Sequence, residues 1–298
     1  MFSACSVPPW SRFVLPILVL PIVGQSFLLG SPPLASWKDA EFTLPQVLES
    51  RDGGAYRNVD YQEARDIDER DQIDEKRVHK QYVSLEPKRM QKNRRMKVPG
   101  GFISYYAVGT EKGAANITIY IHGQGGSRHQ GVNDWTFGGN FNRIKNLMTR
   151  NQGLYLCPDF SDFGPQGAAQ IKALLLHYRQ LSPEADLFAA FGSAGGQIGY
   201  QLARDPEIAK ELDGILMLGS TFDAGYLSSA AFQNRVPFYI GHGSADTVVP
   251  IGNMENFYRS LKSRGYPVRM VRFQTGSHGT PIRMTDWREV LNWMKSAQ

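Results

Sequence analysis

Ser193 lies where a serine could act as a nucleophile. It stands in the segment GSAGG (192–196), between an apolar run expected to be a strand (187–191) and a segment expected to be a helix (197–204). A serine at a sharp turn from a strand into a helix has its hydroxyl lifted off the sheet, and the backbone N–H of the next residue points into the same space. The local sequence therefore predicts an exposed and reactive serine.

An acid and a base follow Ser193 in the chain, each after an apolar run. Asp246 lies in HGSADTVVP (242–250), and His278 lies in GSHG (276–279). An imidazole can take the proton of a serine hydroxyl during attack, and a carboxylate can hold that imidazole in the required tautomer. The sequence therefore predicts a triad of Ser193, His278 and Asp246.

A glycine-rich loop, IHGQGG (121–126), follows another apolar run. Glycines at the end of a strand let backbone N–H groups converge on an oxygen that becomes negatively charged when a carbonyl is attacked. We expect the amides of Gln124 and Ala194 to form this oxyanion hole. Such a loop could instead bind phosphate, but the sequence has neither G-x-x-x-x-G-K-[ST] nor G-x-G-x-x-G.

Other residues compete for these roles. His122 is the main rival base, although a histidine in a glycine-rich loop more often shapes the loop. Asp223 is the rival acid because it follows the apolar run 215–218, and the motif around Asp246 makes Asp246 the preferred acid. The remaining histidines and the glycine-flanked serines are expected to be structural: His79, His129, His177, His242, Ser127, Ser220 and Ser244. No H-E-x-x-H or paired Cys or His spacing occurs, so we expect neither a metal nor another cofactor.

From residue 98 onward, apolar runs of strand length alternate with longer segments of helical character. This alternation predicts an α/β domain with a mainly parallel sheet. The expected strands are 102–108, 117–121, 154–157, 187–191, 215–218, 238–240 and 268–273, and the expected helices are 135–150, 168–180, 197–204, 252–264 and 286–295. In such sheets ligands bind beyond the carboxyl ends of the strands, where each member of the predicted triad falls.

Residues 98–298 resemble the α/β-hydrolase superfamily, in particular its compact phospholipase/carboxylesterase and dienelactone-hydrolase type. The resemblance rests on the His-Gly loop, the small-residue turn around Ser193, the segment HGSADTVVP and the late Gly-x-His. It implies an α/β-hydrolase fold with helices flanking the central sheet. It also implies Ser193 as nucleophile, His278 as general base and then acid, and Asp246 as the group that orients the imidazole. Phe191 replaces the first glycine of the usual Gly-x-Ser-x-Gly turn, so its ring must turn away or open the turn.

Only 52 residues separate Ser193 from Asp246, which leaves no room for a large lid domain. A shallow open cleft suits small soluble esters or exposed acyl groups on larger molecules. We therefore expect a serine hydrolase that cleaves carboxylic esters through an acyl-enzyme, with phospholipase or lysophospholipase activity on acyl lipids as the more specific version. A serine peptidase and a non-catalytic binding protein on the same scaffold are the alternatives.

The first 36 residues have the character of a signal peptide. Arg12 is their only charged side chain, and 13–23 is an 11-residue apolar run, the size of an h-region. Small residues allow cleavage after Ser26 or after Ser36. We expect residues 1–36 to direct the protein to the periplasm or the medium, with an uncleaved N-terminal membrane anchor as the alternative. Of the two cysteines, Cys5 lies in this leader and Cys157 is expected in the core, so no intramolecular disulfide is expected.

Residues 37–97 are expected to be a charged extension, with a domain boundary near Val98. Residues 60–75 are rich in Asp and Glu and 76–97 in Lys and Arg, and the two blocks could pair with each other. We expect a solvated helical or irregular segment that packs on the catalytic domain of 98–298. Its basic face could contact an anionic membrane surface or an envelope polymer. The net charge of +5 is too small to imply a nucleic-acid partner.

Overall fold

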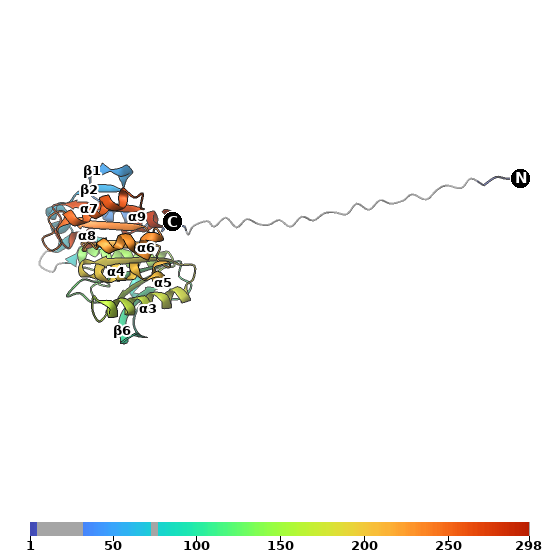
Figure 1. The fold of residues 1–298 in the computed structure, drawn as a ribbon, viewed down its shortest axis with the longest axis horizontal. Coiled ribbons are helices and arrows are strands. Elements are labelled where there is room, and N and C mark those ends of the chain that lie inside the picture. Colours follow the sequence, from blue (N-terminus) through green and yellow to red (C-terminus); the bar gives the residue numbers. More distant parts are fainter. Residues whose placement is uncertain (5–31, 73–76, 298) are drawn as a thin grey trace.

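The computed structural model describes residues 1–4, 32–72 and 77–297. Ten strands form one mixed sheet: β1 (Val47–Arg51), β2 (Tyr56–Asp60), β5 (Gln91–Val98), β6 (Gly101–Gly109), β7 (Asn116–Ile121), β8 (Leu154–Pro158), β9 (Asp186–Gly192), β10 (Gly214–Leu218), β11 (Phe238–Gly243) and β12 (Val268–Gln274). Their order across the sheet is β1-β2-β12-β11-β10-β9-β7-β8-β6-β5. The strands from β2 to β8 in this order are parallel, while β1, β6 and β5 run antiparallel to their neighbours. Figure 1 shows β1 and β2 at one end of the molecule and β6 at the other.

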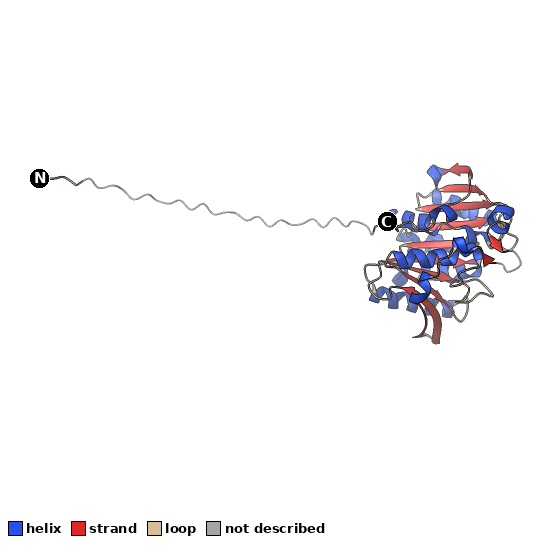
Figure 2. Ribbon diagram, turned by 180° about the vertical axis from the view of Figure 1, so that it is seen from behind, coloured by secondary structure: helices blue, strands red, loops and turns tan. Residues whose placement is uncertain are grey.

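Helices cover both faces of this sheet (Figure 2). The longer ones are α2 (Asn140–Arg150), α3 (Pro165–Leu181), α4 (Gly196–Arg204), α7 (Ile251–Lys262) and α9 (Trp287–Ser296), and the shorter ones are α1 (Asp39–Phe42), α5 (Pro206–Ala209), α6 (Ala230–Gln233) and α8 (Thr280–Met284). Side chains alternate between the two faces along a strand. Ile119 and Ile121 of β7 therefore pack in a core with α3, α4 and α7, whereas Tyr120 between them packs with α2 and α9.

The predicted fold class is confirmed. Each of the seven strands and five helices expected after residue 98 is present at its predicted place, within a few residues at the ends. Between Ser193 and Asp246 the described residues form α4, α5, β10, α6, β11 and a 3₁₀ turn, η8 (Ala224–Ser228), but no lid domain. Cys157 is free and buried in the core, as expected.

The expected division of the chain at Val98 does not match the sheet. Segment 37–97 is not an irregular extension, because it supplies strands at both ends of the same sheet. β2 pairs in parallel with β12, and β5 pairs antiparallel along β6. The turn between β5 and β6 passes through Gly100, whose φ of +78° suits glycine. The main sheet therefore contains strands from both sides of the expected boundary. The same segment also forms a small separate sheet of two strands, β3 (Asp71–Gln72) and β4 (Arg77–Val78).

The charged side chains of this segment form ion pairs with several parts of the molecule. Lys92 and Arg94 of the basic block form ion pairs with Glu111 on the loop after β6. Asp71 of the acidic block pairs with Arg283 of α8. Arg65 pairs with Asp60 and Asp66 inside the acidic block. The described ion pairs of 60–97 are thus made partly within the acidic block and partly with the rest of the molecule.

Leu34, near the end of the predicted leader of 1–36, packs on the body of the molecule. Leu34 is 1% exposed; its N–H donates to Asn292 Oδ1 at 2.7 Å, and its carbonyl accepts from Arg288 Nε at 2.8 Å. The apolar run 13–23 lies outside the described residues. Within the described part of the chain, no helix is both long and apolar enough to span a bilayer.

Candidate active site

Ser193, His278 and Asp246 form one chain of hydrogen bonds. Ser193 Oγ lies 2.8 Å from His278 Nε2, and His278 Nδ1 lies 2.8 Å from Asp246 Oδ2. They follow β9, β12 and β11, whose parallel orientation brings their carboxyl ends to one edge of the sheet. The Asp246 side chain is fully buried, while that of His278 is 28% exposed. The structure therefore brings the three predicted residues together at a site that solvent reaches.

The backbone of Ser193 is held in a conformation that is unusual for serine. Its φ is +49°, in the left-handed region, and it begins the short 3₁₀ turn η7 (Ser193–Gly195) that leads into α4. A non-glycine residue persists there only when its surroundings hold it. Ser220 supplies one such contact, because its Oγ donates to the Ser193 carbonyl at 2.8 Å. This is the strand-to-helix turn that the sequence predicted.

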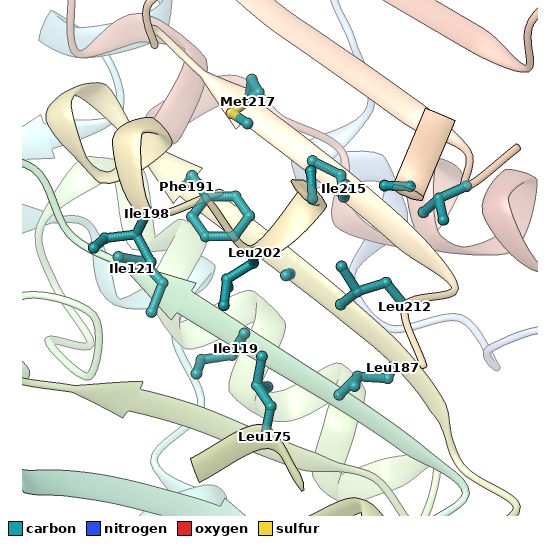
Figure 3. Packing of buried hydrophobic residues seen from close by; sticks show 14 of the residues in the cluster. Ile119, Ile121, Leu175, Leu187, Phe191, Ile198, Leu202, Leu212, Ile215 and Met217 are labelled. Carbon is teal, nitrogen blue, oxygen red and sulfur yellow. The ribbon is translucent and has the colours of Figure 1, made fainter. Parts of the chain in front are cut away.

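Phe191 does not open this turn. Its ring is fully buried and points into the core, where Figure 3 shows it among Ile121, Ile198 and Met217. Gly199 of α4 makes the space, since a Cβ at that position would lie 2.9 Å from the ring. The ring therefore turns away from the site, which is the first of the two arrangements that the sequence allowed.

The glycine-rich loop lies directly against the serine. A Cβ added to Gly123 would lie 2.8 Å from Ser193 Cβ, so only glycine permits this approach. The contact brings the segment that carries Gln124 to the nucleophile, and Ala194 is the next residue in the chain. Of the two predicted oxyanion-hole residues, Ala194 thus follows Ser193 in the chain, and Gln124 follows Gly123, which lies against Ser193.

His122 is engaged within this loop. Its Nδ1 lies 2.9 Å from the Gly123 carbonyl, so this nitrogen carries the hydrogen and donates it. The ring stacks on Phe160 with 4.6 Å between the centroids, and burial lowers the pKa of His122 below its ordinary value. His122 shapes the loop, which is the role that the sequence favoured over that of a base.

Asp223, the rival acid, is engaged elsewhere. One of its carboxylate oxygens accepts from the Gly225 N–H at 2.7 Å and caps η8, and the other accepts from Arg204. The glycine-flanked serines have structural partners as well: Ser244 Oγ accepts from the Thr275 N–H, and Ser127 Oγ lies 3.3 Å from the His129 N–H. The described hydrogen bonds therefore leave Asp246 as the acid that meets His278.

A second histidine contacts the buried acid. His242 Nε2 lies 2.7 Å from the Val249 carbonyl and 3.4 Å from Asp246 Oδ2, so Nε2 carries the hydrogen. Burial lowers the pKa of His242, which keeps the ring neutral at neutral pH. The sequence favoured only a structural role for His242. The spacing of four residues between His242 and Asp246 was the available sign of this contact, because a tight loop can bring two residues at that spacing close together.

The segment before β5 supports the loop that carries His278. Thr275 Oγ1 donates to the Tyr61 carbonyl at 2.9 Å. In α8, Arg283 donates two bonds to the Asp71 carboxylate, at 2.6 and 2.9 Å, and both side chains are buried. Sequence reasoning missed these residues because their partners lie more than 200 positions away in the chain.

Comparisons with known proteins are informative only at the level of structure. No protein-family model matches the chain, and no curated protein matches its sequence. Among solved structures, a candidate α/β hydrolase from Agrobacterium tumefaciens is similar over 67% of this chain and 93% of its own, with 18% identity and a TM-score of 0.54. The chain has the α/β-hydrolase fold.

Two further α/β-hydrolase structures support the same conclusion. A thermostable esterase is similar over 69% of this chain and 62% of its own, with 17% identity and a TM-score of 0.53. An α/β serine hydrolase without a lid, from Xanthomonas campestris, is similar over 68% of this chain and 93% of its own, with 16% identity and a TM-score of 0.51. At these identities the likeness establishes the fold, and the sub-type stays a prediction.

Proposed function

We propose that the protein is a serine hydrolase that cleaves carboxylic esters. The observation that carries the proposal is the continuous hydrogen-bond chain from Ser193 through His278 to Asp246 at a partly exposed edge of the sheet. A protein with only a binding role would not need these three side chains to be hydrogen-bonded to one another. Two structurally similar proteins are described as an esterase and as a serine hydrolase, which also favours this reaction class.

The geometry gives each residue a role in the proposed reaction. Asp246 accepts from His278 Nδ1, so Nε2 is free to take the Ser193 proton as Oγ attacks the ester carbonyl. The amides of Gln124 and Ala194 would stabilise the negative oxygen of the tetrahedral intermediate. His278 then gives its proton to the leaving alcohol, and an acyl-enzyme remains on Ser193. Water, activated by His278, attacks this acyl group and releases the acid.

We propose short acyl chains as the first substrates to test, because no lid domain covers the site in the described residues and an open cleft suits small esters. The phospholipase version of the proposal requires long chains instead. A series of p-nitrophenyl esters from acetate to decanoate distinguishes the two. A rate that rises steeply with chain length would support the lipid substrate.

The rates of hydrolysis of a matched ester and anilide distinguish an esterase from a peptidase. p-Nitrophenyl acetate and p-nitroacetanilide share the acyl group and the aromatic ring and differ in the atom that leaves. We expect hydrolysis of the ester, dependent on Ser193, and no hydrolysis of the anilide above background. Comparable rates for the two compounds would show that the site cleaves amides and would contradict the ester assignment.

We also propose that the protein is exported and that its leader is removed after Ser26. Cleavage after Ser36 would remove Leu34, together with its buried side chain and its two hydrogen bonds. Sequencing the N-terminus of the protein, expressed with its own leader in a bacterial host and recovered from outside the cytoplasm, should give Phe27. A sequence that begins at Trp37, or one that retains Met1, would contradict this proposal.

A further inference from the structure

A cavity of about 480 Å³ lies beside the loop that carries His278. Ser277 and Gly279, its neighbours in the chain, both line this cavity. Phe137, in the 3₁₀ turn before α2, and Tyr61, after β2, form other walls. Tyr61 belongs to the segment outside the region that resembles α/β hydrolases, so this cavity depends on a part of the chain that the resemblance does not cover.

Phe137 is a fixed wall of the cavity. Its φ is +49°, a conformation that a bulky side chain adopts only when packing holds it there. Its ring packs edge-on against Phe141, with 5.5 Å between centroids, and lies 3.6 Å from where a Cβ of Gly279 would be. The ring therefore lies against the residue that follows His278.

The chemistry of the site indicates which part of an ester this cavity would bind. His278 must deliver its proton to the leaving oxygen, so the alcohol part has to lie on the His278 side of Ser193. The glycine-rich loop, through Gly123, approaches Ser193 itself. We propose that this cavity binds the alcohol part of the substrate and that Phe137 gives the enzyme a preference for bulky apolar alcohols. The proposal rests on the proposed ester hydrolysis.

The charges around the cavity add a second element of specificity. Arg283 and Asp71 line it but neutralise each other through their paired hydrogen bonds. Glu63 and Asp68 also line it, both are exposed, and neither takes part in an ion pair among the described residues. The cavity therefore carries a negative charge at its edge, which disfavours an alcohol part that bears an anion.

Acetate esters that differ only in the alcohol test this assignment on the full chain. We expect kcat/KM for 3,3-dimethylbutyl acetate to exceed that for ethyl acetate by about tenfold or more, since extra methyl and methylene groups gain this much in a fitting pocket. Phe137→Ala should remove most of this preference, so that kcat/KM falls far more for 3,3-dimethylbutyl acetate than for ethyl acetate. Phe137→Leu should keep part of the preference, and Phe102→Ala, at an exposed phenylalanine on β6, should keep all of it.

Charge and acyl controls complete the experiment. Asp68→Asn should raise kcat/KM for 4-acetoxybutanoate, whose alcohol part carries a carboxylate, relative to 3,3-dimethylbutyl acetate. If Phe137→Ala changes the preference between ethyl acetate and ethyl butanoate but not that between alcohols, the assignment to the alcohol is overturned. An equal loss with every ester would show a merely structural role and overturn it too. Failure of the proposed function is a different result: no ester is cleaved by the wild type, and Ser193 does not react with a fluorophosphonate.

Discussion

Ser193→Ala is expected to abolish ester hydrolysis, lowering kcat by roughly 10³ to 10⁶-fold. The change removes the atom that forms the acyl-enzyme, and no other described hydroxyl is hydrogen-bonded to His278. The fold should be unaffected, because the Ser220 contact with this residue is made to its backbone carbonyl. Hydrolysis of p-nitrophenyl acetate, with circular dichroism to verify folding, measures the effect.

Ser127→Ala is the matched control for this substitution. The Ser127 hydroxyl lies near a backbone N–H of its own loop and has no contact with the triad among the described hydrogen bonds. Its removal should leave the rate near that of the wild type. A Ser193→Ala protein that retains most of its activity would show that another residue is the nucleophile.

Asp246→Asn is expected to lower kcat by about 10⁴-fold while the protein remains folded. Asp246 Oδ1 accepts from the N–H groups of Val248 and Val249, at 2.8 and 2.9 Å, so an asparagine must keep its oxygen there. Its NH₂ group then takes the place of Oδ2 and faces His278 Nδ1 and His242 Nε2. Nδ1 of His278 must become an acceptor, Nε2 carries the hydrogen, and the ring can no longer take the Ser193 proton.

Asp223→Asn tests the rival acid in the same assay. Asp223 caps η8 and pairs with Arg204, so its substitution should cost some stability and little activity. A large loss of kcat in Asp223→Asn, with Asp246→Asn nearly as active as the wild type, would reverse the assignment of the acid.

The sequence was sufficient to predict the central strands and the proximity of Ser193, His278 and Asp246. Strands buried on both faces, such as β10, are continuous apolar runs that stand out from their surroundings. Ser193 and Asp246 follow buried strands, and His278 follows the half-buried strand β12, so their meeting follows from the parallel sheet. The fold class and the proximity of the three side chains could therefore be predicted together.

The edges of the sheet could not be predicted in this way. β5 is QKNRRMKV, and most of its side chains are exposed, so it lacks the alternation that marks a half-buried strand. Charged residues on an edge strand are common because they discourage pairing with other chains. Composition alone therefore suggested a solvated segment, whereas pairing with β6 makes it a strand.

Contacts that depend on tertiary packing could not be predicted from the sequence either. The space for the Phe191 ring is made by Gly199 on the following helix, and this is visible only once the helix is packed on the strand. The contact between Thr275 and the Tyr61 carbonyl joins positions 214 residues apart. Neither contact leaves a local pattern, and the cavity beside His278 depends on the same kind of long-range packing.

Labelling with a fluorophosphonate probe is the most direct test of the triad. Such probes react covalently with serines that a neighbouring base has activated. The purified wild-type protein should carry one adduct, located on Ser193 by peptide mass, and Ser193→Ala should carry none. A well-folded wild-type protein that does not react, or that reacts at a different serine, would contradict the proposed triad, and the absence of any reaction would favour a binding protein built on a hydrolase fold.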